Sequence, residues 1–301
     1  MNTLEKKEVS VIIASKVGAP FIDDCLTSLA NQENAPDFEV IVVDCHGKET
    51  QDRIARNFPW ARLIAQDTRR TIPDLRRIGV EHAKGQIIAI LEEHCLAAKD
   101  WIKTIVKAHE NQCAAVGGSV LDDNYNRLRD WVTYFCEYNA YMPPVSSGVV
   151  NDVPGNNVSF KQDVLRKHLA NLNHGYWEAF LYSSLQSEKA ILFSDPGMEV
   201  YHRGPFDYGY YLRQRYLFSR AYSGARREFV PKGRRAIYAL ASPLLPALLL
   251  GRIAMRVWKK RCHVDKFLLC LPMLIPVSMV YVFGEVVGYL AGPGNSLMEV
   301  E

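Results

Sequence analysis

The sequence lacks several features that would assign it to a structural class at once. It contains no low-complexity run and no internal repeat of a recognised period, which excludes solenoid and fibrous architectures. Its N-terminus, MNTLEKKEVS, is polar and has no apolar core of the kind found in secretory signals. The seven cysteines are odd in number and show neither paired metal spacing nor a disulfide framework, as is typical of a reducing compartment. We therefore expect the N-terminal domain to stay in the cytoplasm.

A strong overall charge is also missing, because the formal net charge is only +3. The charges are unevenly placed, however. Residues 203–266 hold fifteen Lys and Arg against three acidic residues, a balance of +12, whereas residues 1–202 hold 21 basic and 27 acidic side chains, a balance of −6. A basic C-terminal part indicates an anionic partner, either lipid or nucleic acid. Because its basic residues flank apolar runs instead of following a groove, we expect a membrane and no nucleic acid.

Two hydrophobic segments, 236–253 and 267–291, lie in this basic part. The first is barely long enough for a hydrocarbon core that needs about 20 helical residues. Basic residues both precede and follow it, namely Lys232, Arg234, Arg235, Arg252, Arg256, Lys259, Lys260 and Arg261. Cytoplasm-type charge at both ends favours a re-entrant or shallow hairpin over a simple span. The alternative is an apolar helical hairpin packed on the soluble core.

The first 100 residues alternate between two kinds of pattern. Runs 8–14, 38–43, 61–65 and 86–91 are rich in β-branched and aliphatic residues and predict buried strands, whereas 21–32, 52–58 and 73–84 have helical spacing. Strands that alternate with helices require right-handed crossovers. The sequence therefore predicts an α/β fold with a Rossmann-like, mostly parallel sheet flanked by helices, followed by a hydrophobic helical region.

Polar residues cluster where these strands end. Glu92, Glu93 and His94 follow the fourth predicted strand directly, and Asp44 closes the second. Ligands of open α/β sheets bind outside the carboxyl ends of the strands, so we expect Ser15, Asp44 and Glu92 to line one site. Two carboxylates and an imidazole could hold a divalent ion, which in turn could hold phosphates. The alternatives are a solvated loop at 92–94 and an ordinary turn role for Asp44.

The helix before the fourth strand supplies Arg76 and Arg77, either of which could meet a phosphate. An exposed helical face is the alternative for one of them. Further on, residues 208–227 combine aromatic and basic side chains at helical spacing. One face holds Tyr211, Arg215, Phe218 and Tyr222, and another holds Arg213, Arg220 and Arg227. We interpret this segment as an interfacial helix with its aromatics at the lipid boundary; a plain packing helix is the alternative.

Several of these motifs resemble family 2 glycosyltransferases of the GT-A fold. The similarity runs from VSVIIAS through EVIVVDCHG to DLRRIGVEHAKGQIIAILEEHC, and continues with GNNVSF at 155–160, GYWEAFL at 175–181 and VYHRG at 200–204. It covers roughly residues 8–225. The resemblance implies an inverting transfer of a sugar from a nucleotide-sugar, expected to be a UDP-sugar. Together with the basic, hydrophobic C-terminal part, it leads us to expect a lipid-linked or membrane-proximal acceptor and a site at the cytoplasmic side of the cell (inner) membrane. We expect a catalytic domain over 1–205, an interfacial region over 206–235 and a membrane-associated hairpin over 236–301.

The resemblance also assigns roles to single residues. Donor contacts fall on Ala14, Ser15, Asp44, Arg76, Glu92 and Glu93, and Mg²⁺ or Mn²⁺ ligands on Glu92, His94 and His202. Acceptor contacts fall on Gly155, Asn156, Asn157 and Trp177, and the general base on Glu178. Each has a structural alternative: a strand-end histidine for His202, a helix-start glutamate for Glu178, a core tryptophan for Trp177 and turn chemistry for 155–157.

The chain departs from the family pattern at the metal motif, where Glu92-Glu93-His94 replaces an Asp-x-Asp type, and at Ala179, where relatives often carry the catalytic Asp. A rival interpretation is therefore a membrane-anchored nucleotide-binding protein that has lost turnover. A nucleotidyltransferase on a similar sheet is disfavoured, because residues 15–20 hold one Gly and one Lys instead of a glycine-rich basic loop.

Overall fold

The computed structural model describes residues 7–170, 177–204, 207–227 and 229–300; the side chains of 177–179 and 239 are outside the description. The chain divides into two compact units. Of the described residues, the first takes in 7–123, 141–170 and 177–203, and the second takes in 124–140 and those from 204 onward. The second unit thus includes a segment, 124–140, that the sequence assigned to the catalytic domain.

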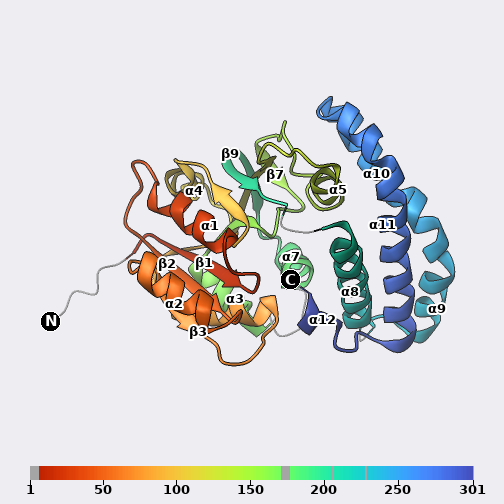
Figure 1. Ribbon diagram of the computed structural model, residues 1–301, viewed down its shortest axis with the longest axis horizontal. Helices are drawn as coiled ribbons and strands as arrows, with labels where there is room; N and C mark the ends of the chain where they lie inside the picture. Colours follow the sequence, from red (N-terminus) through yellow and green to blue (C-terminus); the bar gives the residue numbers. More distant parts are fainter. Residues whose placement is uncertain (1–6, 171–176, 205–206, 228, 301) are drawn as a thin grey trace. The chain divides into compact units, whose positions relative to one another are not determined.

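The first unit is built on one nine-stranded sheet (Figure 1). Its strands are β1 (Val9–Ser15), β2 (Phe38–Asp44), β3 (Arg62–Ala65), β4 (Ile87–Glu92), β5 (Cys95–Ala97), β6 (Ala115–Asp122), β7 (Gly148–Val150), β8 (Asn157–Lys161) and β9 (Leu192–His202). The order is β3-β2-β1-β4-β8-β6-β9-β5, with β7 on β9. The strands β3, β2, β1 and β4 are parallel, whereas β8 runs antiparallel to both β4 and β6. The predicted α/β class is confirmed, with a parallel N-terminal half and a mixed remainder.

Helices connect these strands and cover the sheet. They are α1 (Phe21–Ala30), α2 (Lys48–Asn57), α3 (Ile72–His82), α4 (Trp101–Ala108), α6 (Gln162–Lys167) and α7 (Trp177–Ser187). All seven residues of β1 are buried, as its apolar run predicts for a central strand. Ile12, Ile41 and Ile90 of three adjacent strands join Val158 and Phe160 in one core. Burial on both faces keeps the backbone of these strands rigid where they end.

The start of α3 shows how the sequence sets a helix boundary next to these strand ends. The Thr71 hydroxyl accepts a hydrogen bond from the Asp74 backbone N–H, and Pro73 occupies the first turn, where no intrahelical partner is needed for its nitrogen. Gly79, in the middle of α3, lies against Ile12 of β1 so closely that a β-carbon would overlap the Ile12 side chain. This close approach fixes α3, and with it Arg76, beside the sheet.

The second unit is helical. It consists of α5 (Leu128–Glu137), α8 (Tyr208–Arg226), α9 (Lys232–Ala241), a 3₁₀ turn over Ser242–Leu244, α10 (Leu245–Lys260), α11 (Val264–Ala291) and the short α12 (Ser296–Glu299). Pro243 and Pro246 fall in the first turns of the 3₁₀ segment and α10, where proline is tolerated. The two predicted hydrophobic segments thus form α9–α10 and α11.

The aromatic and basic segment at 208–227 forms the predicted helix, α8, and part of its aromatic face is buried. Tyr211 is only 2% exposed, and the Arg215 guanidinium lies over the Phe218 ring and over the Tyr281 ring of α11. Tyr211 therefore fits the packing alternative, and the interfacial role of 206–235 stays a prediction.

Candidate functional site

Three strand ends meet at one edge of the sheet. In the register of the parallel strands, Ala14 lies opposite Val43 and Glu92, and Ser15 lies opposite Asp44. The common edge predicted for Ser15, Asp44 and Glu92 is therefore present. Ala14 is nearly buried and offers only its backbone there.

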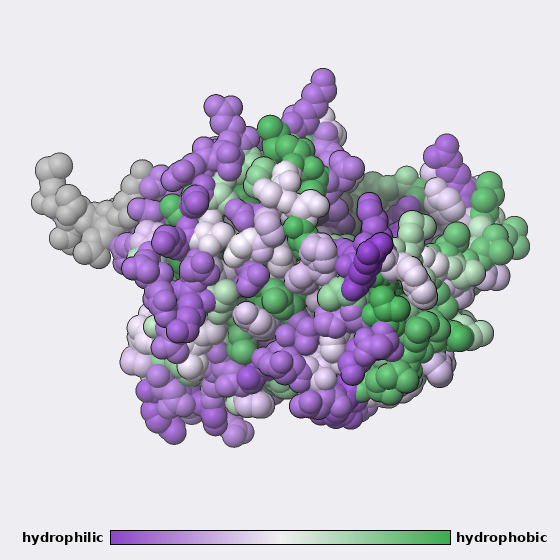
Figure 2. All heavy atoms as spheres, turned by 90° about the horizontal axis from the view of Figure 1, so that it is seen from above, coloured by the Kyte–Doolittle hydropathy of each residue, from purple (hydrophilic) through white to green (hydrophobic). Residues whose placement is uncertain are grey.

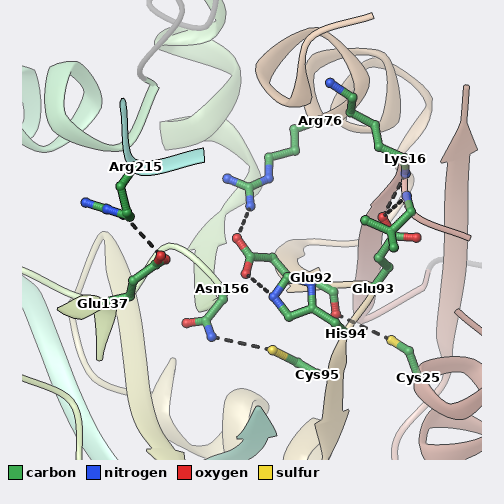
Figure 3. Close-up of polar contacts among 11 residues, drawn as sticks. Lys16, Cys25, Arg76, Glu92, Glu93, His94, Cys95, Glu137, Asn156 and Arg215 are labelled. Atoms are coloured by element: carbon green, nitrogen blue, oxygen red, sulfur yellow. Dashed lines mark hydrogen bonds and ion pairs between the residues drawn. The ribbon is translucent and has the colours of Figure 1, made fainter. Parts of the chain in front are cut away.

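Glu92 is the centre of a charged cluster at this edge. Its Oε1 accepts a hydrogen bond from the Arg76 guanidinium at 3.0 Å, and its Oε2 lies 3.3 Å from His94 Nε2 (Figure 3). Burial opposes ionisation of Glu92, but the hydrogen bond from His94 and the charges of His94 and Arg76 outweigh it and lower its pKa to about 2. Glu92 is thus a carboxylate at neutral pH, and its side chain remains 28% exposed.

His202 approaches the same cluster from the far end of the sheet. The β5–β9 pairing sets His202 opposite Cys95, the Arg203 N–H donates to the His94 carbonyl at 2.9 Å, and the His94 and His202 rings are 5.0 Å apart. Burial, and then the neighbouring His94, holds the pKa of His202 well below its usual value, so its ring is neutral and can donate a lone pair.

These side chains suit a divalent ion. Ligand atoms of Glu92, His94 and Cys95 lie within 4.8 Å of one another. One carboxylate and neutral nitrogen donors match the preferences of Mn²⁺ or a similar borderline ion better than those of Mg²⁺, which favours oxygen. Burial raises the pKa of the Cys95 thiol well above its usual value, so it is protonated without an ion. The donor set therefore fits the predicted ion, with Cys95 as a neighbour that the sequence prediction did not include.

Glu93 points away from this cluster and holds the loop after β1. Its carboxylate accepts backbone hydrogen bonds from Lys16 at 2.7 Å, Val17 at 2.8 Å and Gly18 at 2.9 Å, and it lies 3.1 Å from the Ser15 hydroxyl (Figure 3). Burial raises the pKa of Glu93, and the three N–H groups oppose that rise. With both oxygens occupied and a side chain 3% exposed, Glu93 shapes the site through this loop and offers no oxygen to a ligand here.

Asp44 and Arg76, both predicted donor contacts, are also tied into the protein. Asp44 is fully buried, accepts a hydrogen bond from the Ser15 hydroxyl at 2.8 Å and caps the Gly47 N–H at 3.3 Å. These contacts are the turn role that the sequence left open as an alternative. Arg76 is 2% exposed, and its guanidinium donates a hydrogen bond to Glu92, so it helps to hold the Glu92 carboxylate in place.

The predicted acceptor residues at 155–157 have unequal environments. Asn157 is fully buried: its side-chain oxygen accepts from Trp101 Nε1 at 2.8 Å, and its amide donates to the Ser119 and Met198 carbonyls. The side-chain amide of Asn157 thus ties β6, β9 and α4 together, and its assignment as an acceptor contact stays a prediction. Asn156 donates to Cys95 Sγ at 3.5 Å, and its Oδ1 has no hydrogen-bond partner in the described part of the chain. Gly155 precedes them in a partly exposed turn.

Trp177 and Glu178 lie in the first turn of α7, but their side chains are outside the described residues. The assignments of Trp177 as an acceptor contact and of Glu178 as the base therefore stay predictions.

Arg203 is a structural tie that the sequence gave no reason to single out. Its guanidinium pairs with Asp24 of α1 and donates to Asp123, just after β6, at 2.7 Å. Together with the bond from its N–H to His94, these contacts join three segments beside His202. No periodicity or motif predicts them, because the partners are about 80 and 179 residues away in the chain.

Comparison with known proteins agrees with this geometry. A family model described as glycosyl transferase family 2 matches residues 10–169. A glucosyl-dolichyl phosphate glucuronosyltransferase of Haloferax volcanii is 31% identical over 137 residues, which are 42% of each chain. The mannosyltransferase PcManGT of Pyrobaculum calidifontis, solved with GDP-Man and Mn²⁺, has a TM-score of 0.61 at 18% identity and covers 95% of this chain and 88% of its own. The structural likeness shows a shared fold.

Proposed function

The chain belongs to glycosyltransferase family 2, and from this premise we propose that it transfers a sugar, with inversion, from a nucleotide-sugar to a lipid-linked or membrane-proximal acceptor. The observation that supports the proposal most is the Glu92 cluster: an ionised carboxylate, a buried arginine and two imidazoles at the carboxyl edge of β1, β2 and β4. This is the edge at which α/β sheets bind nucleotides. A UDP-sugar is the first donor to test.

In this proposal Glu92, His94 and His202 would hold Mn²⁺ or Mg²⁺, with Cys95 beside them. When bound, such an ion would offset negative charge on the leaving diphosphate. Arg76 supplies a second, protein-borne positive charge at the same edge. Its guanidinium has five N–H donors, so a phosphate oxygen can be bound beside its contact with Glu92. The loop at 16–18, fixed by Glu93, forms the other side of the donor site.

The transfer itself needs one base. The acceptor hydroxyl oxygen forms a bond to the anomeric carbon as the bond from that carbon to the diphosphate oxygen breaks, and the nucleoside diphosphate leaves with the electron pair. The hydroxyl proton passes to a carboxylate, for which we propose Glu178 at the start of α7. A single displacement of this kind inverts the anomeric configuration. Gly155, Asn156 and Trp177 are the proposed acceptor contacts.

The proposed acceptor class is supported by the C-terminal helices. The structure holds two helical segments, Lys232–Lys260 and Val264–Ala291, that are long and apolar enough to cross a membrane. The Haloferax relative carries a dolichyl phosphate substrate in its name. We therefore propose membrane association through 236–301, a catalytic domain over 1–205 and a cytoplasm-facing site, with a lipid-linked acceptor presented at the membrane surface.

The direct test is turnover by the purified full chain in lipid. A panel of UDP-, GDP- and dTDP-sugars is incubated with polyprenyl-phosphate and glycolipid acceptors, with Mn²⁺, Mg²⁺ or chelator, and the product's anomeric configuration is read by NMR. We expect an inverted product, lost in Glu178→Gln and strongly reduced in Glu92→Gln. Glu81→Gln is the matched control, since Glu81 pairs with Arg77 on the surface of α3 and this variant should transfer normally.

Two outcomes separate the alternatives. Full transfer by Glu178→Gln would remove the base assignment but leave the enzyme. Calorimetric binding of a nucleotide without transfer, across the whole panel of donors and acceptors, would instead favour the non-catalytic nucleotide-binding protein.

A further inference from the structure

The two long apolar segments of the second unit have the composition of a membrane-crossing hairpin. The segment α9–α10 covers 29 residues and α11 covers 28, against about 20 needed for a span. A helix can cross a hydrocarbon core only if the helices that run beside it can also lie there. The neighbours of α11 therefore decide whether this hairpin crosses.

Along most of its length α11 runs parallel to α8. The Tyr208 hydroxyl donates to the Met273 carbonyl at 2.7 Å, the Tyr216 and Phe283 rings stack at 5.7 Å, and Gly288 lies directly against the Ser223 hydroxyl. Successive turns of α8 thus lie beside successive turns of α11. If α11 entered a bilayer, α8 would lie at the same depth in it.

At the level of the middle of α11, α8 carries exposed charge. Arg213 lies between Tyr208 and Tyr216 and pairs with Glu299 of α12. The side chains of this pair are 58% and 40% exposed, so they are not enclosed by the protein. Nearby, Arg215 of α8 pairs with Glu137 of α5 at 3.1 Å (Figure 3). If α11 crossed a bilayer, the exposed pair would face hydrocarbon, where charged side chains are rare and costly.

The first turns of α11 have a similar neighbour. There α5, which carries Arg129, Asp130 and Glu137, packs Trp131 on His263 at 4.5 Å between ring centres and Phe135 on Phe267 at 5.6 Å. The end of α10 is tied to the chain just after α5, because Arg256 donates to Asn139 at 2.8 Å and Lys260 to the Ala140 carbonyl at 3.1 Å. The turn between α10 and α11 therefore also lies beside polar structure.

The other side of the same helices is apolar and exposed, over their whole length. On α9–α10 the exposed side chains are Ile237, Leu240, Leu244, Leu248, Met255 and Trp258, and on α11 they are Leu268, Leu269, Ile275, Met279, Phe283 and Leu290. Apart from Leu269, which is adjacent to Leu268, they recur every three, four or seven residues, as expected for a stripe along a helix. Figure 2 shows apolar side chains, in green, gathered on the surface of these helices. An exposed patch of this extent marks an interaction surface.

We propose that this surface lies flat on an anionic lipid bilayer, with α9–α10 and α11 in the plane of one leaflet and neither crossing it. Charge supports lipid as the partner: residues 232–266 hold nine Lys and Arg and one acidic residue, Asp265. Basic residues beside an apolar helical stripe are typical of helices that bind the headgroup region of anionic membranes. Trp258, at the end of α10, is 58% exposed, as expected for an aromatic side chain at a lipid boundary.

This inference rests on the membrane association proposed above but not on the sugar transfer. The first measurement is flotation of the full chain with sealed vesicles of phosphatidylcholine, with or without about 30% phosphatidylglycerol. We expect the anionic lipid to raise binding at least about tenfold, with the gain lost in high salt. Leu240→Glu combined with Leu248→Glu should lower binding at least about 100-fold. Val149→Glu is the control, because Val149 is an equally exposed apolar residue on β7 of the first unit. Equal binding by the double variant and the wild type would overturn the proposed surface.

The second measurement separates lying flat from crossing. Reporter cysteines are placed at the two ends of α11, as Lys259→Cys near the α10–α11 turn and Asn295→Cys after the helix; both positions are exposed, and native Cys262 in the turn is followed in parallel. The vesicle-bound protein is treated with a membrane-impermeant maleimide before and after detergent, and labelling is read by peptide mass spectrometry. We expect both ends to label fully without detergent. Labelling of one end only after detergent would show a crossing and overturn the in-plane arrangement. An absence of any vesicle binding would overturn the membrane association itself, whatever the outcome of the transfer assay.

Discussion

Removing the Glu93 carboxylate should open the loop after β1 while leaving the sheet intact. In Glu93→Gln one oxygen remains, so the two bonds from Lys16 and Val17 can persist. The other oxygen, Oε2, accepts a hydrogen bond from the Gly18 N–H at 2.9 Å in the wild type. In the variant an NH₂ group takes its place and faces the same N–H. Two donors then meet in a buried environment, and the Gly18 N–H is left without a partner.

The magnitude follows from these contacts. A hydrogen bond to a charged group contributes about 1.5–3 kcal/mol, so the loss of one such bond in Glu93→Gln should cost about 2 kcal/mol of local stability. Glu93→Ala removes all three backbone bonds, but it also relieves the burial of a carboxylate, which offsets part of the loss. We expect about 3–5 kcal/mol for the alanine variant.

Amide hydrogen exchange at residues 16–18 measures this effect directly. A loss of about 2 kcal/mol corresponds to about a 30-fold fall in protection for Glu93→Gln. Glu81→Gln, which alters a surface pair whose carboxylate is 43% exposed, should change protection at 16–18 by less than a factor of two, or roughly 0.4 kcal/mol. Unchanged protection of Lys16, Val17 and Gly18 in both Glu93 variants would refute the anchoring role.

Three further predictions concern stability. Burial lowers the pKa of His109 from 6.5 to about 4, so the stability contributed by its neutral ring is fully present above pH 6.5 and is lost as the pH falls toward 4. The difference between the two pKa values corresponds to about 3 kcal/mol. In urea unfolding at pH 7 and at pH 4.5, His109→Gln should therefore lose less stability on acidification than the wild type. Gly288→Ala should destabilise the α8–α11 packing by about 2 kcal/mol or more, because the added β-carbon overlaps the Ser223 hydroxyl. A β-carbon added at Gly251 would meet no atom within 4 Å, so Gly251→Ala should leave the melting temperature unchanged or raise it. Asn157→Ala should lower the free energy of unfolding by about 2–4 kcal/mol, because three buried hydrogen bonds are lost. The KM for the acceptor should stay constant in the protein that remains folded. A raised KM without a change in stability would instead support a direct contact between Asn157 and the acceptor.

The N-terminal half of the fold was predictable because its signals are local. The apolar runs before Ser15, Asp44 and Glu92 are buried parallel strands, and parallel strands necessarily bring their carboxyl ends to one edge. The second half of the sheet was harder to predict. β5 and β7 have three residues each and β9 contains Pro196 and Gly197, so neither length nor alternation identifies them.

The sequence could propose candidate site residues, but it could not predict their contacts. The order Glu92-Glu93-His94 suggested three ligands, yet in the structure the side chain between them turns to the loop at 16–18. Cys95 was missed because a lone cysteine after a strand carries no spacing signal. The aromatic face of α8 was correctly grouped by helical period, but periodicity alone cannot distinguish a face that packs on another helix from one that meets lipid.

A structure of the full chain with a nucleoside diphosphate and Mn²⁺ tests the central claim most directly. The account predicts the ion in contact with Glu92 and His94, the diphosphate beside Arg76, and the Glu178 carboxylate facing the side of the donor site where an acceptor hydroxyl would attack. A nucleotide bound away from the edge formed by β1, β2 and β4, or a Glu178 side chain directed away from Glu92, would contradict it.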